Sequence, residues 1–190
     1  MKKIAITGGI GSGKSTACKI IKELGYPVYS CDEIYKEIVL SKEYIEKIDQ
    51  TFVGVVKNGS IDKKELSNIV FSDEEQLKKL NTIAHPIVMQ RLLSNMEKEN
   101  SAICFAEVPL LFEGNFQDLF DGCLIIRRKK TDRIKAVKER DGLSEREILS
   151  RMQNQVNHCR IQSTPKIVKI TNNDTEQILR EKIKNYIETL

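Results

Sequence analysis

The sequence has no tryptophan, only four prolines and no long apolar run. Its longest apolar stretch, Ala102 to Val108, is far shorter than the roughly 18 residues that a membrane-spanning helix needs, so we expect no association with a membrane. Met1 to Thr7 has two lysines and a short apolar stretch but no cleavage site of small residues, so we expect no secretory signal. A cytoplasmic location fits these absences.

The sequence is also poor in residues that ligate transition metals. Its two histidines are His85 and His158, and none of its cysteines forms a C-x-x-C pair. The five cysteines are Cys18, Cys31, Cys104, Cys123 and Cys159. An odd number with this spacing favours reduced thiols over disulfides or a zinc site.

The sequence has only a small excess of positive charge. It contains 31 Lys and Arg residues and 27 Asp and Glu residues, which gives a net charge of +4. The basic run Arg127 to Lys130 has no flanking aromatic residues to stack on bases, so we expect no nucleic-acid partner and place the run at a solvated strand end. No feature of the sequence predicts an oligomer. With 40% hydrophobic and 31% charged residues, the composition is that of a soluble globular domain with one core.

Short apolar runs alternate with helical patterns along the chain. The runs that predict strands are Lys3–Thr7, Val28–Ser30, Ala102–Val108, Cys123–Ile126 and Ile167–Ile170. Strands of this kind, separated by helices, predict an α/β fold with a five-stranded parallel sheet covered by helices on both faces.

Several helix starts are marked by capping patterns. Ser72 to Glu75 and Ser144 to Glu147 both match the S-x-x-E capping box. Asp174 to Gln177 is expected to open the last helix, and Asp32 is placed to cap the helix after the second strand. The buried face of the last helix is predicted to carry Ile178, Leu179, Ile183 and Ile187.

The strongest chemical pattern is Gly8 to Ser15, which matches G-x-x-x-x-G-K-[ST] between a predicted strand and a predicted helix. Glycines let backbone N–H groups approach phosphate oxygens, and the start of the helix adds its positive dipole end. Lys14 suits the β- and γ-phosphates, and the Ser15 hydroxyl suits Mg²⁺. We therefore predict a site for a nucleoside triphosphate.

Two absences narrow the class of protein that carries this loop. No D-x-x-G follows the third strand, where Pro109 to Glu113 stands instead, and no N-K-x-D occurs, so a GTPase is not expected. A small-molecule kinase needs an acid near the phosphates. Asp32 is either that general base or a helix cap, and the two roles are compatible. Glu107 either orients Mg²⁺ through water or is a buried carboxylate satisfied by backbone N–H groups.

A kinase also needs a mobile cationic flap, and Thr131 to Gln155 fits one. Arg133 and Arg140 are seven residues apart, on one face of a predicted helix. Asp141-Gly142 then breaks the chain before a second helix. Arginine forks bind phosphate oxygens bidentately. The alternative is a solvated, charged helical hairpin without a ligand.

Six segments, in this order and spacing, resemble those of the dephospho-CoA kinase family, over about residues 3 to 160. They are Thr7–Thr16, Cys31–Asp32, Asn58–Leu66, Leu80–Pro86, Val108–Glu113 and Arg140–Ser144, with Gln155 beyond them. The resemblance implies a P-loop NTPase core and ATP-dependent phosphorylation of the ribose 3′-hydroxyl of dephospho-CoA, with Mg²⁺, to give coenzyme A. The rival interpretations are another P-loop kinase, such as a nucleoside-monophosphate kinase, and a nucleotide-dependent switch protein.

The resemblance also implies roles for individual residues. Asp32 would be the general base, and Lys14 and Arg140 would act on the transferring phosphoryl group. ATP would be bound by Gly8, Gly9, Gly11, Ser12, Gly13, Lys14, Ser15, Thr16 and Arg140, with Ser15 also on Mg²⁺. The acceptor would be bound by Asp32, His85, Leu111, Phe112, Glu113 and Arg133. For His85 a helix-capping or packing role is the alternative, and Leu110 is expected in the core.

The same comparison predicts a single kinase domain with two insertions. The core would comprise residues 1–41, 99–130 and 160–190. An acceptor-binding helical insertion without strands would span about 42–98, and the lid about 131–159. Ser163 to Asn173 departs from the family's Ala-Asp-x-Val-Ile-x-Asn segment, because only the strand and the closing Asn are kept.

Overall fold

The computed structural model describes all 190 residues, which form two compact units. The first, here called the core unit, comprises Met1–Tyr29 and Lys98–Leu190. The second, here called the helical unit, is Ser30–Glu97. None of the helices is both long enough and apolar enough to cross a membrane.

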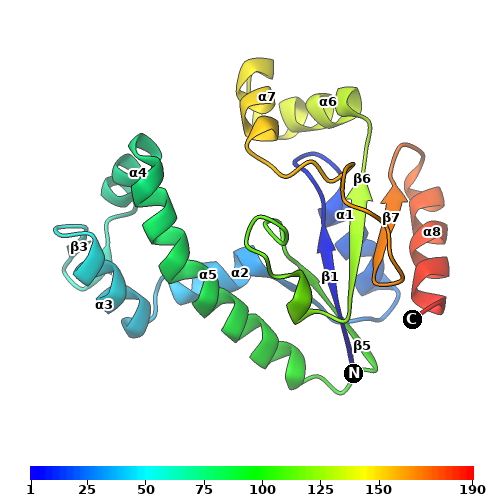
Figure 1. The fold of residues 1–190 in the computed structure, drawn as a ribbon, viewed down its shortest axis with the longest axis horizontal. Helices are drawn as coiled ribbons and strands as arrows, with labels where there is room; N and C mark the ends of the chain where they lie inside the picture. The colour runs from blue at the N-terminus through cyan, green and yellow to red at the C-terminus, as the bar shows by residue number, and fades with distance from the viewer. The chain divides into compact units, whose positions relative to one another are not determined.

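A five-stranded sheet forms the centre of the α/β fold (Figure 1). Its strands are β1 (Lys2–Thr7), β2 (Val28–Ser30), β5 (Ile103–Glu107), β6 (Gly122–Arg127) and β7 (Ile167–Thr171). They lie in the order β2-β5-β1-β6-β7. β1 pairs in parallel with β5 and β6, and β6 with β7. The five predicted strands are confirmed, with small shifts at their ends.

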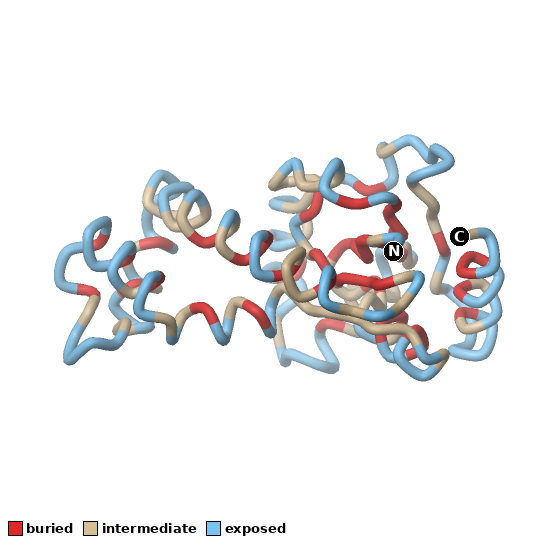
Figure 2. The backbone as a smooth tube through the Cα atoms, turned by 90° about the horizontal axis from the view of Figure 1, so that it is seen from below, coloured by how far each residue is buried: buried red, intermediate tan, exposed pale blue.

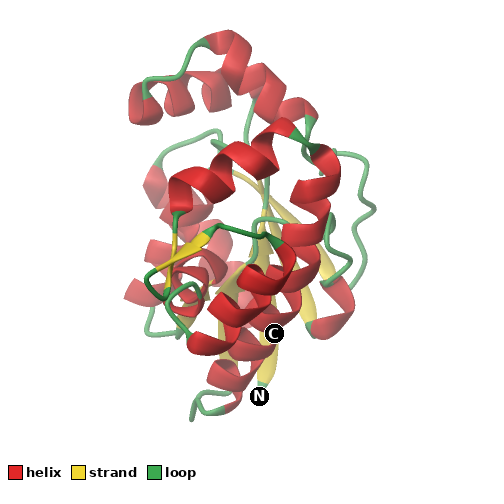
Figure 3. Ribbon diagram, turned by 90° about the vertical axis from the view of Figure 1, so that its left-hand side faces the viewer, coloured by secondary structure: helices red, strands yellow, loops and turns green.

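Four helices belong to the core unit (helices are red in Figure 3). They are α1 (Lys14–Glu23), α6 (Lys130–Asp141), α7 (Glu145–Gln153) and α8 (Glu176–Glu188), with a short 3₁₀ turn η1 (Gln117–Leu119). α1 and α8 contact each other and share one hydrophobic cluster with the sheet. In that cluster Ile20 and Ile183 meet Ile4, Phe105 and Leu124, all of them almost fully buried.

The opposite face of the sheet is made of smaller side chains. Ala5, Cys104, Ala106 and Cys123 alternate with the residues of the first cluster and are also buried. Figure 2 shows, in red, buried segments gathered in the interior of the core unit. Burial on both faces explains why the strands read as continuous apolar runs in the sequence.

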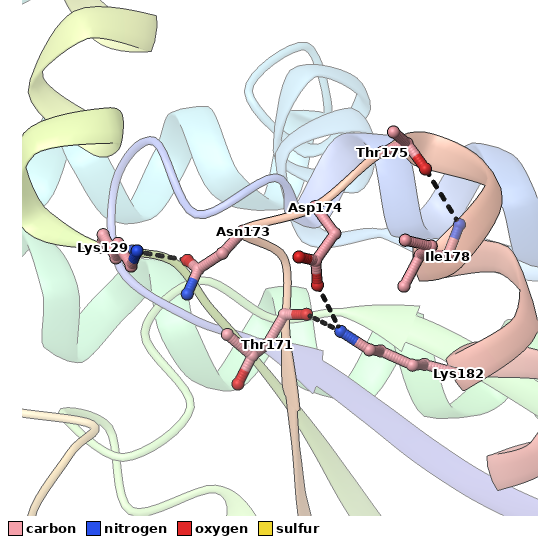
Figure 4. Close-up of polar contacts among 7 residues, drawn as sticks. All are labelled: Lys129, Thr171, Asn173, Asp174, Thr175, Ile178 and Lys182. Carbon is pink, nitrogen blue, oxygen red and sulfur yellow. Dashed lines mark hydrogen bonds and ion pairs between the residues drawn. The ribbon is translucent and has the colours of Figure 1, made fainter.

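The last helix begins one residue later than expected. Thr175, not Asp174, caps it by accepting a hydrogen bond from the Ile178 N–H at 3.4 Å (Figure 4). Asp174 instead accepts from Lys182 Nζ at 2.8 Å. Ile178 is 39% exposed, so its predicted place on the buried face is wrong, whereas Leu179 and Ile183 are buried there.

One of the two predicted capping boxes is present. The Ser144 hydroxyl accepts from the Glu147 N–H, and the Glu147 carboxylate accepts from the Ser144 N–H at 2.9 Å. At the other, the Ser72 hydroxyl donates back to the Asn68 carbonyl at 2.8 Å, because Ser72 ends the preceding helix. Asp73 accepts from the Glu75 N–H instead.

The helical unit contains four helices and one small hairpin (Figure 1). Its elements are α2 (Cys31–Ile38), α3 (Lys42–Thr51), β3 (Val56–Lys57), β4 (Ser60–Ile61), α4 (Lys63–Ser72) and α5 (Glu74–Glu97). α2, α3 and α4 all pack against the long helix α5. The expectation of no strand here is wrong: β3 and β4 pair antiparallel around Asn58 and Gly59, whose φ angles of 52° and 74° form the turn.

Candidate active site

A phosphate loop, residues 8–13, joins β1 to α1. Gly11 and Gly13 have φ angles of 74° and 91°, which side chains rarely adopt. Gly13 is the N-cap of α1, and no side chain caps the helix, so the first N–H groups of α1 are open to an anion. Lys14 Nζ donates to the Gly8 carbonyl at 2.9 Å across the loop. This is the geometry that the sequence motif predicts.

The glycines of the loop also allow close packing by the rest of the core unit. A Cβ at Gly9 would run into the Arg133 guanidinium, and one at Gly11 would lie 2.6 Å from the Arg133 carbonyl oxygen. A Cβ at Gly13 would meet the Asn172 amide, which donates to the Ser12 carbonyl at 3.0 Å. The loop is therefore enclosed by α6 and by the end of β7.

The two lid arginines have different partners. Arg133 Nε donates to the Ile10 carbonyl of the phosphate loop at 2.8 Å, and burial lowers the pKa of this guanidinium. Arg140 is exposed and pairs with the carboxylate of Asp141 through two hydrogen bonds of 2.7 and 2.8 Å. That pairing raises the pKa of Arg140 and lowers the pKa of Asp141. Both arginines lie on α6 as predicted, but only Arg133 contacts the phosphate loop in this structure.

A cavity of about 440 Å³ lies beside the phosphate loop in the core unit. Its cationic lining comprises Arg127, Arg128, Lys130 and Arg133, and no acidic residue lines it. Three buried polar atoms on its lining residues have no hydrogen-bond partner in the protein: Ser12 Oγ, Arg128 Nε and His158 Nε2. Buried polar atoms are normally paired, so this cavity is suited to an anionic ligand with hydrogen-bonding oxygens.

His158 is the buried imidazole of this cavity. It is 8% exposed, and its ring packs edge-on against Phe112 with 6.1 Å between ring centroids. Burial lowers the pKa of His158; the nearby charge of Glu113 opposes that shift, whereas those of Lys14 and Arg133 add to it. The imidazole is therefore neutral near pH 7.

The loop after β5 places its side chains differently from expectation. Leu111, predicted to bind substrate, is fully buried, whereas Leu110, predicted in the core, is 40% exposed. The reason is the tight turn in which the Phe116 N–H donates to the Leu111 carbonyl at 2.9 Å and the Gly114 N–H to the Leu110 carbonyl at 2.9 Å. Glu113 accepts from the Val156 N–H at 2.9 Å, and its second carboxylate oxygen is buried without a partner.

Glu107, at the end of β5, lies beside a buried thiol. Burial, together with the charge and hydrogen bonding of Glu107, raises the pKa of Cys18 to about 12. The carboxylate is half-buried. Its thiol partner differs from the backbone N–H groups that one interpretation assigned to it.

Asp32 and His85 both belong to the helical unit. Asp32 lies in the first turn of α2, whose N-cap is Ser30, and no hydrogen bond within this unit engages its carboxylate. His85 is half-buried inside α5, next to Pro86, and burial lowers its pKa. The capping alternatives for both residues are therefore wrong.

Ser15 meets the requirement for a magnesium ligand that its position suggests. Its side chain is exposed in the first turn of α1, and no protein group forms a hydrogen bond with its hydroxyl. No group of three or more His, Cys, Asp or Glu residues could hold a metal ion. A hydroxyl beside a phosphate cradle fits Mg²⁺, which takes few protein ligands and completes its shell with phosphate oxygens and water.

Three residues at the site were missed or under-used in the sequence. Gln155 accepts a hydrogen bond from the Ile10 N–H at 2.8 Å, Asn172 holds Ser12, and His158 lines the cavity. The available signal was the resemblance to the dephospho-CoA kinase family: Gln155 lies within it, and the closing Asn is kept in a segment that otherwise departs from it. Nothing in the local pattern around His158 marks it as buried.

Comparison with known proteins agrees with this geometry. Residues 2–177 match the family model of dephospho-CoA kinase. The chain is 37% identical to a dephospho-CoA kinase of Fusobacterium nucleatum over 193 residues, covering 98% of this chain and 97% of the relative. It is 36% identical to one of Thermus thermophilus over 148 residues, covering 78% of this chain and 72% of the relative.

Solved structures lead to the same family. A crystal structure of a Thermus thermophilus protein superposes with a TM-score of 0.82 at 31% identity, covering 98% of this chain and 97% of the other. A dephospho-CoA kinase from Campylobacter jejuni gives a TM-score of 0.69 at 28% identity, covering 98% and 95%. With its phosphate loop, its two arginine-bearing helices and these matches along nearly its whole length, the chain belongs to the dephospho-CoA kinase family.

Proposed function

We propose that this chain transfers the γ-phosphoryl group of ATP to the ribose 3′-hydroxyl of dephospho-CoA, giving coenzyme A and ADP. The observation that carries the proposal is the phosphate loop at the uncapped start of α1, within a chain that matches the dephospho-CoA kinase family over residues 2–177. Helix N-termini and glycine-rich loops bind phosphate because their N–H groups point at one place.

The donor site would hold ATP along Gly8 to Thr16. Lys14 would exchange the Gly8 carbonyl for the β- and γ-phosphates, a movement that its flexible side chain permits. Ser15 would hold Mg²⁺, which supplies positive charge to the phosphate oxygens when bound. The cationic cavity beside the loop, with the unpartnered Ser12 hydroxyl and His158 imidazole, would receive further negative charge.

Asp32 would act as the general base. It would accept the proton of the 3′-hydroxyl while that oxygen forms a bond to the γ-phosphorus and the bond from this phosphorus to the β–γ bridging oxygen breaks, releasing ADP. The carboxylate is suited to this role because no hydrogen bond within the helical unit engages it. His85, Phe112 and Glu113 would contribute to the acceptor site.

Helices α6 and α7 would serve as the lid. Arg140 would leave Asp141 and stabilise the transferring phosphoryl group on closure, and exclusion of water would limit ATP hydrolysis. The helical unit would carry the acceptor-binding side. A small-molecule acceptor and a cytoplasmic location complete the proposal, with neither nucleic acid nor membrane as a partner.

A coupled assay of ADP release tests the activity. We expect turnover with dephospho-CoA and Mg²⁺, and little with AMP, adenosine or no acceptor. Mass spectrometry should show a product heavier by one phosphoryl group, and digestion with a 3′-nucleotidase should remove that group. Turnover with AMP alone would instead identify a nucleoside-monophosphate kinase, and hydrolysis without acceptor would contradict a kinase.

Replacing Asp32 tests the base. Asp32→Asn removes the proton acceptor and keeps the shape, so turnover should fall by at least about 100-fold while ATP affinity by calorimetry stays unchanged. Glu33→Gln is the matched control, because Glu33 is the adjacent exposed carboxylate on α2 and loses the same charge. Near-normal turnover of Asp32→Asn would contradict the assignment.

A further inference from the structure

One residue of the phosphate loop, Ile10, is held at its N–H and at its carbonyl by side chains from the segment of α6 and α7 that follows β6. The Ile10 N–H donates to Gln155 Oε1 at 2.8 Å, and the Ile10 carbonyl accepts from Arg133 Nε at 2.8 Å. These contacts join residues 145 and 123 positions apart in the chain, so no local pattern produces them. Both distances are ideal for hydrogen bonds.

The two side chains come from opposite ends of the α6–α7 pair. Arg133 lies in the first turn of α6, which begins at Lys130, and Gln155 lies two residues after α7 ends at Gln153. The α6–α7 pair therefore contacts the phosphate loop at two places: at the start of α6 and just after the end of α7. A displacement of either end changes the backbone hydrogen bonding of the same residue, Ile10.

Close contact between α6 and the loop strengthens this connection. The Arg133 guanidinium covers Gly9, and its backbone covers Gly11, at separations that leave no room for a Cβ. Gln155 and Arg133 are both partly buried, and burial lowers the pKa of Arg133. Loss of the acceptor of a backbone N–H in such partly buried surroundings costs free energy, because the N–H is left without a hydrogen bond.

We propose that Gln155, together with Arg133, is a positioning residue of the phosphate loop. By fixing the two peptide groups that flank the Ile10 Cα, the two side chains set the orientation of the following N–H groups, from Gly11 to Lys14, toward the transferring phosphoryl group. The inference rests on the proposed kinase function for its catalytic consequence, but the hydrogen-bonding claim stands independently of the acceptor. It assigns Arg133 to the loop instead of to the substrate.

The test compares three variants of the full chain. Gln155→Leu has a similar volume but cannot accept a hydrogen bond, whereas Gln155→Glu keeps an acceptor oxygen in reach of the Ile10 N–H. Asn154→Leu is the matched control, because the adjacent Asn154 is exposed, does not line the cavity and forms no hydrogen bond with the loop. For each we would measure kcat, both KM values, ADP affinity by calorimetry and amide hydrogen exchange of Ile10.

We expect Gln155→Leu to lower kcat by about 10- to 100-fold, the scale of a small misplacement of reacting groups, with the KM for dephospho-CoA within about twofold. Exchange of the Ile10 amide should accelerate at least tenfold. Gln155→Glu should keep slow exchange and a kcat within about threefold of the native chain. Asn154→Leu should match the native chain in every measurement.

Unchanged Ile10 exchange in folded Gln155→Leu would overturn the proposal, as would a kcat equal to that of the native chain. If Gln155→Leu does not fold, fast Ile10 exchange or a large loss of kcat in Gln155→Glu would also overturn it. A native chain that phosphorylates no acceptor would refute the proposed function instead, and Ile10 exchange with ADP affinity would still decide the positioning role.

Discussion

At the scale of single residues, differences in burial predict which cysteine thiols of this chain react readily and which do not. Burial raises the pKa of Cys104 to about 11 and those of Cys18 and Cys123 to about 12. A raised pKa keeps the thiol protonated at pH 8, and the thiolate is the nucleophile. Cys159 is exposed, with Arg127 NH2 3.3 Å from its Sγ. We expect iodoacetamide at pH 8 to label Cys159 at least tenfold faster than these three, as peptide mapping would show.

A nucleotide provides the control for that labelling. Cys159 lines the cavity beside the phosphate loop, so saturating ATP should slow its labelling while leaving the buried thiols unreactive. Equal labelling of all thiols in the folded chain would contradict the burial described here. In denaturant all five should react, since none forms a disulfide.

Sequence reasoning identified residues whose role follows from local pattern and missed those set by distant contacts. The positions of Lys14 and Ser15 at the start of α1 were predictable, because they follow from a local pattern between a strand and a helix. The exchange of roles between Leu110 and Leu111 was not, because two turn hydrogen bonds decide which side chain faces inward. Gln155 required knowledge of a contact across 145 residues.

At the scale of elements, α6 engages at its own end the arginine that we propose to act on the phosphates. Arg140 is engaged by Asp141, and its pairing must break before the guanidinium reaches a ligand. Asp141→Asn removes the competing charge. Because exposed ion pairs are weak, we expect the KM for ATP to fall by at most about fivefold, with little change in melting temperature, as steady-state kinetics would show.

Glu139→Gln is the matched control for this change. It removes one negative charge from the same helix, but Glu139 pairs with Lys135 at 4.0 Å and not with Arg140. An equal fall in KM for both variants would show that the general charge of α6, and not release of Arg140, is responsible. A rise in KM for Asp141→Asn would contradict the competition.

Elements with a strong hydrophobic pattern could be predicted from the sequence. Helix ends at which two neighbouring residues could each act as the cap could not. The five strands follow from apolar runs in the sequence. The capping box at Ser144 follows because Ser144 is the one capping residue at that helix start. Ser72 and Asp73 are adjacent residues that could each cap the next helix. The Ser72 hydroxyl instead forms a hydrogen bond within the preceding helix, and Asp73 accepts from the first turn of the next one. The β3–β4 hairpin has two-residue strands, too short for an alternating pattern to reveal.

Ligand binding should stabilise the whole molecule by an amount that depends on concentration. If only the folded state binds ATP, then ATP at about 100 times its dissociation constant raises the free energy of unfolding by about 2.7 kcal/mol. For a chain of this size that corresponds to a rise in melting temperature of about 5 to 10 °C by calorimetry. Lys14→Ala should reduce the rise to about 2 °C or less. A full rise in that variant would contradict the role of Lys14.

The close packing around Gly9, Gly11 and Gly13 has a consequence for mutational surveys. Each position is subject to two selective constraints, since a side chain there would disturb both the phosphate cradle and its contact with Arg133 or Asn172. A variant library scored only on activity would merge these constraints and attribute every loss to nucleotide binding. At Gly9 and Gly13, compensating changes that shorten Arg133 or Asn172 would separate the two constraints, because they can relieve crowding but cannot replace a lost phosphate contact.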